Sequence, residues 1–239
     1  MICVDHSTAE AAHIFDPNNW MGASKAVILS SWTEFSVLRH CTAQISAMVP
    51  AAERLCANSI ADLQGQWRRA RFPLNDMVFF AQHADLHIRI EAFFSSAKSL
   101  LDLVVQLLST ERIVGARIDG FHRTNDIYGG RVLNALENNA VAERREAAEG
   151  VRHLLLEHKR LWIDQAIAAR DLLVHPDRGM HQLMFNLELA DRDGELVCQR
   201  VNPPHVGDIP IHEYAEQTFA RATEFSSAFL ALVRGEVCV

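Results

Sequence analysis

The chain has 239 residues, of which 49% are hydrophobic and 22% charged, a composition typical of a soluble globular protein with its own core. Its net charge of −7 excludes a uniformly basic surface, so a nucleic-acid partner would need a local basic patch. The five scattered cysteines argue against a disulfide framework or a zinc finger. Because no signal peptide or apolar run of ~20 residues is evident, we expect a cytoplasmic protein with no membrane partner.

The first half of the chain has helical patterns. We predict a helix from about Ser24 to Met48, which ends before Pro50, and a second from about Ala51 to Arg71. Asn75 or Asp76 then provides an N-cap for a third helix, from about Met77 to Leu108. Apolar residues recur at helical spacing along one face of this third helix, namely Leu86, Ile90, Phe93, Ala97, Leu100, Leu101, Val104 and Leu108.

The second half begins with a glycine-containing loop over residues 109–130 and a short helix over about Arg131–Asn138. A long helix is then predicted from about Ala140 to Val174. Its expected core face comprises Val151, Leu154, Leu155, Leu161, Trp162, Ala166 and Leu173.

Beyond residue 182 the period changes from helical to alternating. A β-hairpin is predicted over residues 182–201, with a turn at Asp191–Gly194. A final helix over residues 209–234 has Pro210 near its first turn. Its candidate core residues are Tyr214, Phe219, Phe225, Phe229 and Leu232. The predicted fold class is all-α: a single-domain helical bundle of about five to seven helices with one inserted β-hairpin.

An arginine and a histidine lie at the end of the long helix, in the stretch from Arg170 to His175 that Pro176 follows. Arginine binds phosphate, and histidine transfers protons near neutral pH. Asp171 precedes His175 by four residues, a spacing at which a carboxylate can orient an imidazole on a helix. The R-x4-H spacing occurs twice more, at Arg117–His122 and Arg200–His205, and about one match is expected by chance from composition alone. The spacing alone is therefore uninformative. The stretch from Arg170 to His175 differs from the other two because it alone lies at the end of a long amphipathic helix.

An R-x4-to-6-H motif at the end of a late helix, with a polar residue after the arginine, resembles the HEPN superfamily. The resemblance implies a helical bundle with metal-independent endoribonuclease activity, no cofactor, and a toxin or phage-defence setting. It also implies a homodimer with a composite active site and an antitoxin or other protein partner. The HEPN core would span residues 77–175, with residues 1–71 as a helical extension.

The mechanism that this resemblance implies is attack of an RNA 2′-OH on its own phosphodiester. His175 would act as general acid or base, Arg170 would stabilise the charge on the phosphorane, and Asp171 would orient the imidazole.

The basic residues that could bind RNA have two alternative interpretations. Arg68, Arg69 and Arg71 beside Trp67 would bind an RNA backbone and stack a base, or would form a solvated helix end. Lys98, which shares a polar stripe with Asp102, is a further candidate RNA-binding residue.

His83, His87 and Glu91 are spaced i, i+4, i+8 on the third helix and would supply metal ligands, or simply a solvated helix face. Two other function classes therefore stay open beside the ribonuclease. One is a noncatalytic helical interaction or RNA-binding protein, and the other is a metal-dependent helical-bundle enzyme.

Overall fold

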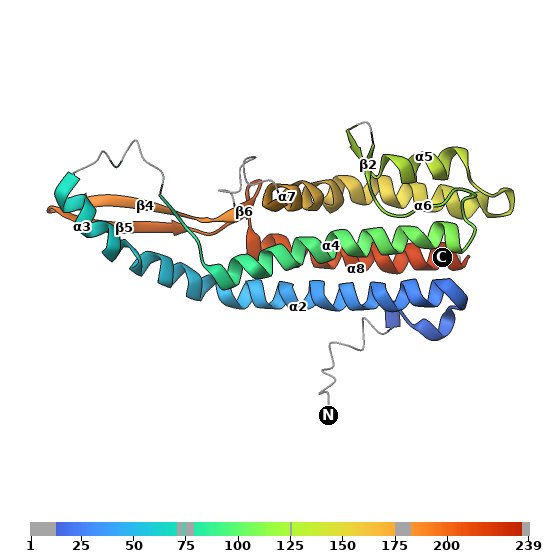
Figure 1. Cartoon of the computed structure of the whole chain (residues 1–239), viewed down its shortest axis with the longest axis horizontal. Coiled ribbons are helices and arrows are strands. Elements are labelled where there is room, and N and C mark those ends of the chain that lie inside the picture. Colours follow the sequence, from blue (N-terminus) through green and yellow to red (C-terminus); the bar gives the residue numbers. More distant parts are fainter. Residues whose placement is uncertain (1–12, 71–73, 75–78, 125, 175–182, 236–239) are drawn as a thin grey trace, which may run out of the picture. The chain divides into compact units, whose positions relative to one another are not determined.

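The computed structural model describes residues 13–70, 74, 79–124, 126–174 and 183–235 (Figure 1). Helices dominate these residues and small antiparallel sheets accompany them, which confirms the mainly helical class predicted from sequence. The chain divides into two compact units. The first comprises Met1–His40, Phe93–Arg170 and Thr218–Val239, and the second comprises Cys41–Ala92 and Asp171–Gln217. Each unit is thus assembled from separate stretches of the chain, and the assignment of a single domain with a core at 77–175 stays a prediction.

Helix α2 (Gly22–Asn58) continues through Pro50, so the predicted end of the helix before this residue is wrong. Pro50 is exposed, and the buried stripe formed by Ile45, Val49, Ala52 and Cys56 continues past it at spacings of four, three and four residues. Burial of this stripe offsets the hydrogen bond that proline cannot donate. The break to α3 (Ile60–Ala70) falls instead at Ser59, whose hydroxyl donates to the Cys56 carbonyl at 2.7 Å.

A short strand, β1 (Phe79–Ala81), occupies positions where the sequence predicted the start of the third helix. The prediction is wrong there because β1 pairs antiparallel with a strand more than a hundred residues later, with Phe79 opposite Leu187. Helix α4 (Ala84–Thr110) follows, and the Nδ1 atom of His83 accepts a hydrogen bond from the Leu86 N–H at 3.3 Å. His83 thus caps the helix, whereas the predicted caps Asn75 and Asp76 lie outside the described residues.

The predicted apolar face of α4 is confirmed, because all eight of its residues are buried. Within the described part of the chain, α4 is the one helix long and apolar enough to cross a membrane by length and composition. More than half of its apolar window, 56%, is buried inside the protein, and a buried core helix meets the same criterion.

The long helix predicted over residues 140–174 is divided by a π-helical turn. After α5 (Gly130–Asn138), a 3₁₀ turn η3 (Ala142–Arg144) leads into α6 (Arg145–His158), the π turn η4 (Lys159–Ile163) and α7 (Asp164–Val174). The π turn changes which residues face the core. Leu161, a predicted core residue, is therefore 45% exposed, whereas Trp162 and Ile163 are buried.

The predicted β-hairpin is confirmed as β4 (Phe185–Arg192) and β5 (Glu195–Asn202) in the second unit. Asp193 and Gly194 form its two-residue turn with positive φ angles of 55° and 84°, as a tight hairpin turn requires. Together with β1 the hairpin forms a three-stranded sheet in the order β1-β4-β5. A second small hairpin, β6 (His205–Val206) and β7 (Ile209–Pro210), follows.

Helix α8 (Ile211–Arg234) begins directly after Pro210, close to the predicted position. Within the first unit, its Phe225 and Phe229 are fully buried, and the ring of Phe219 lies 5.1 Å from that of Phe35 on α2. The Phe225 ring also lies 5.3 Å from His158 on α6. These contacts join α2, α6 and α8 in the aromatic core of the first unit.

Candidate functional site: motif residues and a clamped basic loop

The predicted catalytic motif lies at the end of α7. Arg170 and Asp171 are both half-buried in its last turn, after the buried residues Ala166, Ile167 and Ala169. Arg170 belongs to the first unit and Asp171 to the second. His175, the predicted acid or base, lies outside the described residues.

The predicted RNA-binding arginines of α3 lie beside strand β5 in the second unit. Arg68 Nη2 donates to Glu195 Oε1 at 3.0 Å, and both side chains are exposed. Arg69 Nε donates to the Gly65 carbonyl at 3.2 Å, and Arg71 lies outside the described residues. Trp67 is buried and therefore does not present its ring to a nucleic-acid base.

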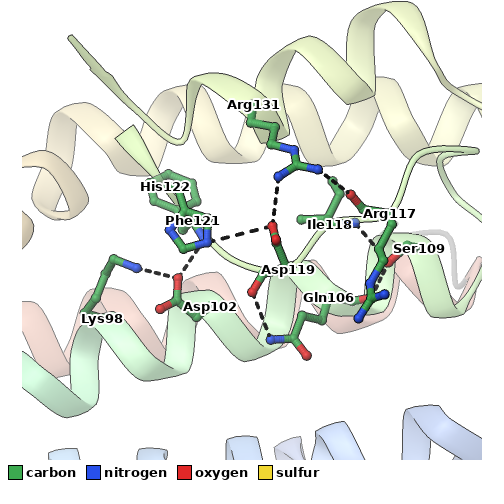
Figure 2. Close-up of polar contacts among 10 residues, drawn as sticks. All are labelled: Lys98, Asp102, Gln106, Ser109, Arg117, Ile118, Asp119, Phe121, His122 and Arg131. Carbon is green, nitrogen blue, oxygen red and sulfur yellow. Dashed lines mark hydrogen bonds and ion pairs between the residues drawn. The ribbon is translucent and has the colours of Figure 1, made fainter. Parts of the chain in front are cut away.

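Lys98 donates a hydrogen bond to Asp102, four residues later on α4. The Asp102 Oδ1 atom also accepts the backbone N–H of Phe121 at 2.6 Å. This pair is mostly shielded from solvent, with the two side chains 19% and 29% exposed. The Lys98–Asp102 pair thus anchors the chain around Phe121 to α4, a role that the sequence did not predict (Figure 2).

A second set of polar contacts fixes the segment 115–129, here called the clamped loop. It includes the short hairpin formed by β2 (Arg123–Thr124) and β3 (Ile127–Tyr128). Gln106 Nε2 donates to the Asp119 carbonyl at 3.4 Å, and Ser109 Oγ accepts the Ile118 N–H at 3.4 Å. From the other side, Lys159 Nζ donates to the Tyr128 carbonyl and to Asp164 Oδ1, each at 2.6 Å. Since Lys159 is buried in the π turn, this turn directs a cation onto the loop.

Two glycines allow the clamped loop to pack this closely. A Cβ atom at Gly120 would lie 2.9 Å from both Asp102 Oδ1 and His122 Nε2. Gly129 has a φ of +69°, and a Cβ atom there would lie 2.2 Å from the buried ring of Phe121. A side chain at either position would collide with its neighbours, so the loop requires glycine at both.

Charged side chains project outward from this fixed backbone. Arg131 Nη1 donates to Asp119 Oδ1 at 3.1 Å, and its Nη2 donates to the Arg117 carbonyl at 3.3 Å. His122 Nε2 lies 3.8 Å from the same Asp119 oxygen. Figure 2 shows Arg131, Asp119 and His122 converging above α4.

The sequence reasoning set this loop aside, although its Arg117–His122 pair has the same spacing as Arg170–His175. The signal that could have identified it is compositional, because residues 115–131 have three arginines against two aspartates in a chain of net charge −7. The convergence of Asp119, His122 and Arg131, by contrast, depends on contacts between distant parts of the sequence.

Within the described residues no group of three or more His, Cys, Asp or Glu side chains is arranged to hold a metal ion. The candidate ligand His83 instead caps α4 through its Nδ1 atom. The thiols of Cys41, Cys56 and Cys198 are free, and burial raises the pKa of each above its ordinary value. None of the three therefore has the lowered pKa of a nucleophilic cysteine.

Comparisons with models of protein families, with curated proteins and with solved structures find no match to this chain.

Proposed function

We propose that the chain is a metal-independent endoribonuclease of the HEPN type, active in a toxin or phage-defence setting. His175 acts as general acid or base and Arg170 stabilises the phosphorane formed when an RNA 2′-OH attacks its phosphodiester. Asp171 orients the imidazole. The products are a 2′,3′-cyclic phosphate and a 5′-hydroxyl end.

The observation that supports this proposal is the position of Arg170 and Asp171 in α7. Buried alanine and isoleucine residues fix the helix in a core up to Ala169, and the exposure then rises at Arg170 and Asp171. Such a pattern leaves charged side chains at the end of a rigid element, which suits a site that must hold a phosphate in a defined geometry. Pro176 follows in sequence and disfavours further helix at His175.

The test is cleavage of a structured RNA by the purified full chain in EDTA, with end-group analysis of the products. We expect the His175→Ala chain to lose a factor of about 10²–10⁴ in rate and the Arg170→Ala chain about 10²–10³. His205→Ala is the matched control, since His205 ends another R-x4-H spacing that the proposal does not use. Cleavage by His175→Ala at the wild-type rate would remove His175 from the mechanism.

The same assay separates the two alternatives. A chain that binds RNA without cleaving it is a noncatalytic RNA-binding protein. Cleavage that EDTA abolishes and added divalent metal restores indicates a metal-dependent enzyme instead.

A further inference from the structure

The clamped loop and Arg131 form an exposed charged surface, with three arginines against two aspartates, that the catalytic proposal leaves unused. Arg117, His122, Arg123 and Arg131 are all exposed, and together with Tyr128 they are here called the loop surface. Apart from one short β-hairpin, the described residues of this loop have no regular secondary structure, and such surface segments often carry binding residues. This loop is also held in place, from α4 by Asp102, Gln106 and Ser109 and from the π turn by Lys159.

We propose that the loop surface binds the phosphate backbone of single-stranded RNA. This inference rests on the proposed ribonuclease function, for which it supplies a substrate contact other than the reacting groups. Arginine is the side chain best suited to phosphate, and a preorganised backbone lowers the entropy cost of binding.

Arg123 has an exposed ion pair that a phosphate could replace. Its guanidinium donates to Asp126 at 2.9 Å, and the two side chains are 49% and 91% exposed. An ion pair this exposed contributes little, so a phosphate can replace the carboxylate at small cost. The same guanidinium lies 5.3 Å from the centre of the Tyr128 ring, its cross-strand partner in the β2–β3 hairpin (Arg123–Thr124 and Ile127–Tyr128). An arginine supported on an aromatic ring presents its other face to a nucleotide base.

A hollow beside Arg117 offers room for a nucleotide. It has a volume of about 630 Å³, and its lining includes Gln106, Ser109, Arg117 and Asp119. Volumes of about 300–1,000 Å³ are typical of small-molecule sites. Asp119, which lines this hollow, pairs with Arg131 at 3.1 Å and lies 3.8 Å from His122.

The chain offers a closely matched control for Arg123. Arg221 is 47% exposed and donates to Glu224 at 2.9 Å with the same i, i+3 spacing, but it lies on α8. Replacing either arginine removes one exposed charge and one exposed ion pair. Only the replacement of Arg123 alters the loop surface.

The experiment measures binding of a 2′-O-methyl RNA oligonucleotide to the full chain as a function of salt. This probe keeps the phosphates but lacks the attacking hydroxyl, so binding is measured without cleavage. We expect Arg123→Ala to reduce the slope of log affinity against log salt by about 0.7, the value for one phosphate contact to a single strand, and Arg221→Ala to leave it unchanged. Asp126→Asn should strengthen binding by up to about fivefold because it releases Arg123, whereas Glu224→Gln should not.

The proposal would be overturned if the salt dependence of binding were the same for wild type, Arg123→Ala and Arg221→Ala. It would also be overturned if both substitutions reduced the salt dependence equally. Polyglutamate that binds with the same dependence on Arg123 as the RNA would also overturn it, in favour of an acidic protein partner. Arg123-dependent binding in a chain that does not cleave RNA supports the loop surface and removes the nuclease. RNA cleavage by a chain whose binding does not depend on Arg123 supports the nuclease and overturns the loop surface.

Discussion

His158 is buried in the first unit, where its Nδ1 atom accepts a hydrogen bond from Trp162 Nε1 at 3.0 Å. An Nδ1 atom that accepts a hydrogen bond carries no proton, so this geometry requires the neutral imidazole with its proton on Nε2. Burial lowers the pKa of His158 below the ordinary value of 6.5, because desolvation disfavours the charged form more than Glu157 and Glu224 favour it. The hydrogen bond and the burial therefore favour the same protonation state.

A pH dependence of stability follows from this lowered pKa. Below about pH 6.5 the unfolded chain binds a proton at His158 that the folded chain does not bind, so the free energy of unfolding should fall as the pH falls through the folded pKa. A His158→Gln chain lacks this contribution. We therefore expect the stability difference between wild type and His158→Gln to narrow between about pH 7.5 and pH 5 in denaturant titrations.

His153→Gln provides the control, since His153 is exposed on the same helix α6. A stability difference between wild type and His158→Gln that does not change with pH would show that the neutral state of His158 does not contribute to stability.

Individual elements show how burial can override a local signal. Pro50 is a strong helix breaker by itself, yet α2 continues through it because the buried stripe continues on both sides. The helix keeps this proline on its exposed face, where the missing N–H leaves no buried polar group.

Replacing Pro50 by alanine should stabilise the chain. Alanine restores the N–H and removes the clash with the preceding turn, and the difference in helix propensity is about 3 kcal/mol in a helix interior. Because the unfolded chain also gains freedom, we expect a net increase of about 1–2 kcal/mol in the free energy of unfolding. Denaturant titration measures it, with the exposed Arg54→Ala of the same helix as control, for which we expect almost no change. A destabilised Pro50→Ala chain would mean that the folded state requires a distortion at this position.

The sequence predicted the elements whose signal is local. The periodic face of α4 and the β4–β5 hairpin were both correct, although the predicted turn at Asp191–Gly194 is narrower in the structure, where Asp191 and Arg192 belong to β4. Two errors have different causes. Leu161 faces solvent because the π turn that contains it shifts the helical register. Phe79–Ala81 form a strand only because the distant strand β4 pairs with them. The loop surface was missed for the same reason, because its groups are positioned by Asp102 and Lys159 from elsewhere in the chain.

At the scale of the whole molecule, charge distinguishes the loop surface from the rest of the chain. The chain has 30 acidic against 23 basic residues, so long-range electrostatics oppose an approaching polyanion. This repulsion is largely screened beyond a Debye length of about 8 Å at physiological salt, so contacts made directly at the loop surface must provide the binding free energy.

The composite active site that the HEPN resemblance implies gives a prediction for the assembled protein. If one copy can supply Arg170 and another His175, the two chains Arg170→Ala and His175→Ala should each be inactive alone and regain RNA cleavage when mixed and allowed to exchange subunits. Light scattering should first show a dimer for wild type and for both variants. The control mixes two preparations of His175→Ala, which cannot supply the missing imidazole from either copy. If the Arg170→Ala and His175→Ala dimers exchange subunits but stay inactive, each site uses both residues from one chain, and the composite arrangement is excluded.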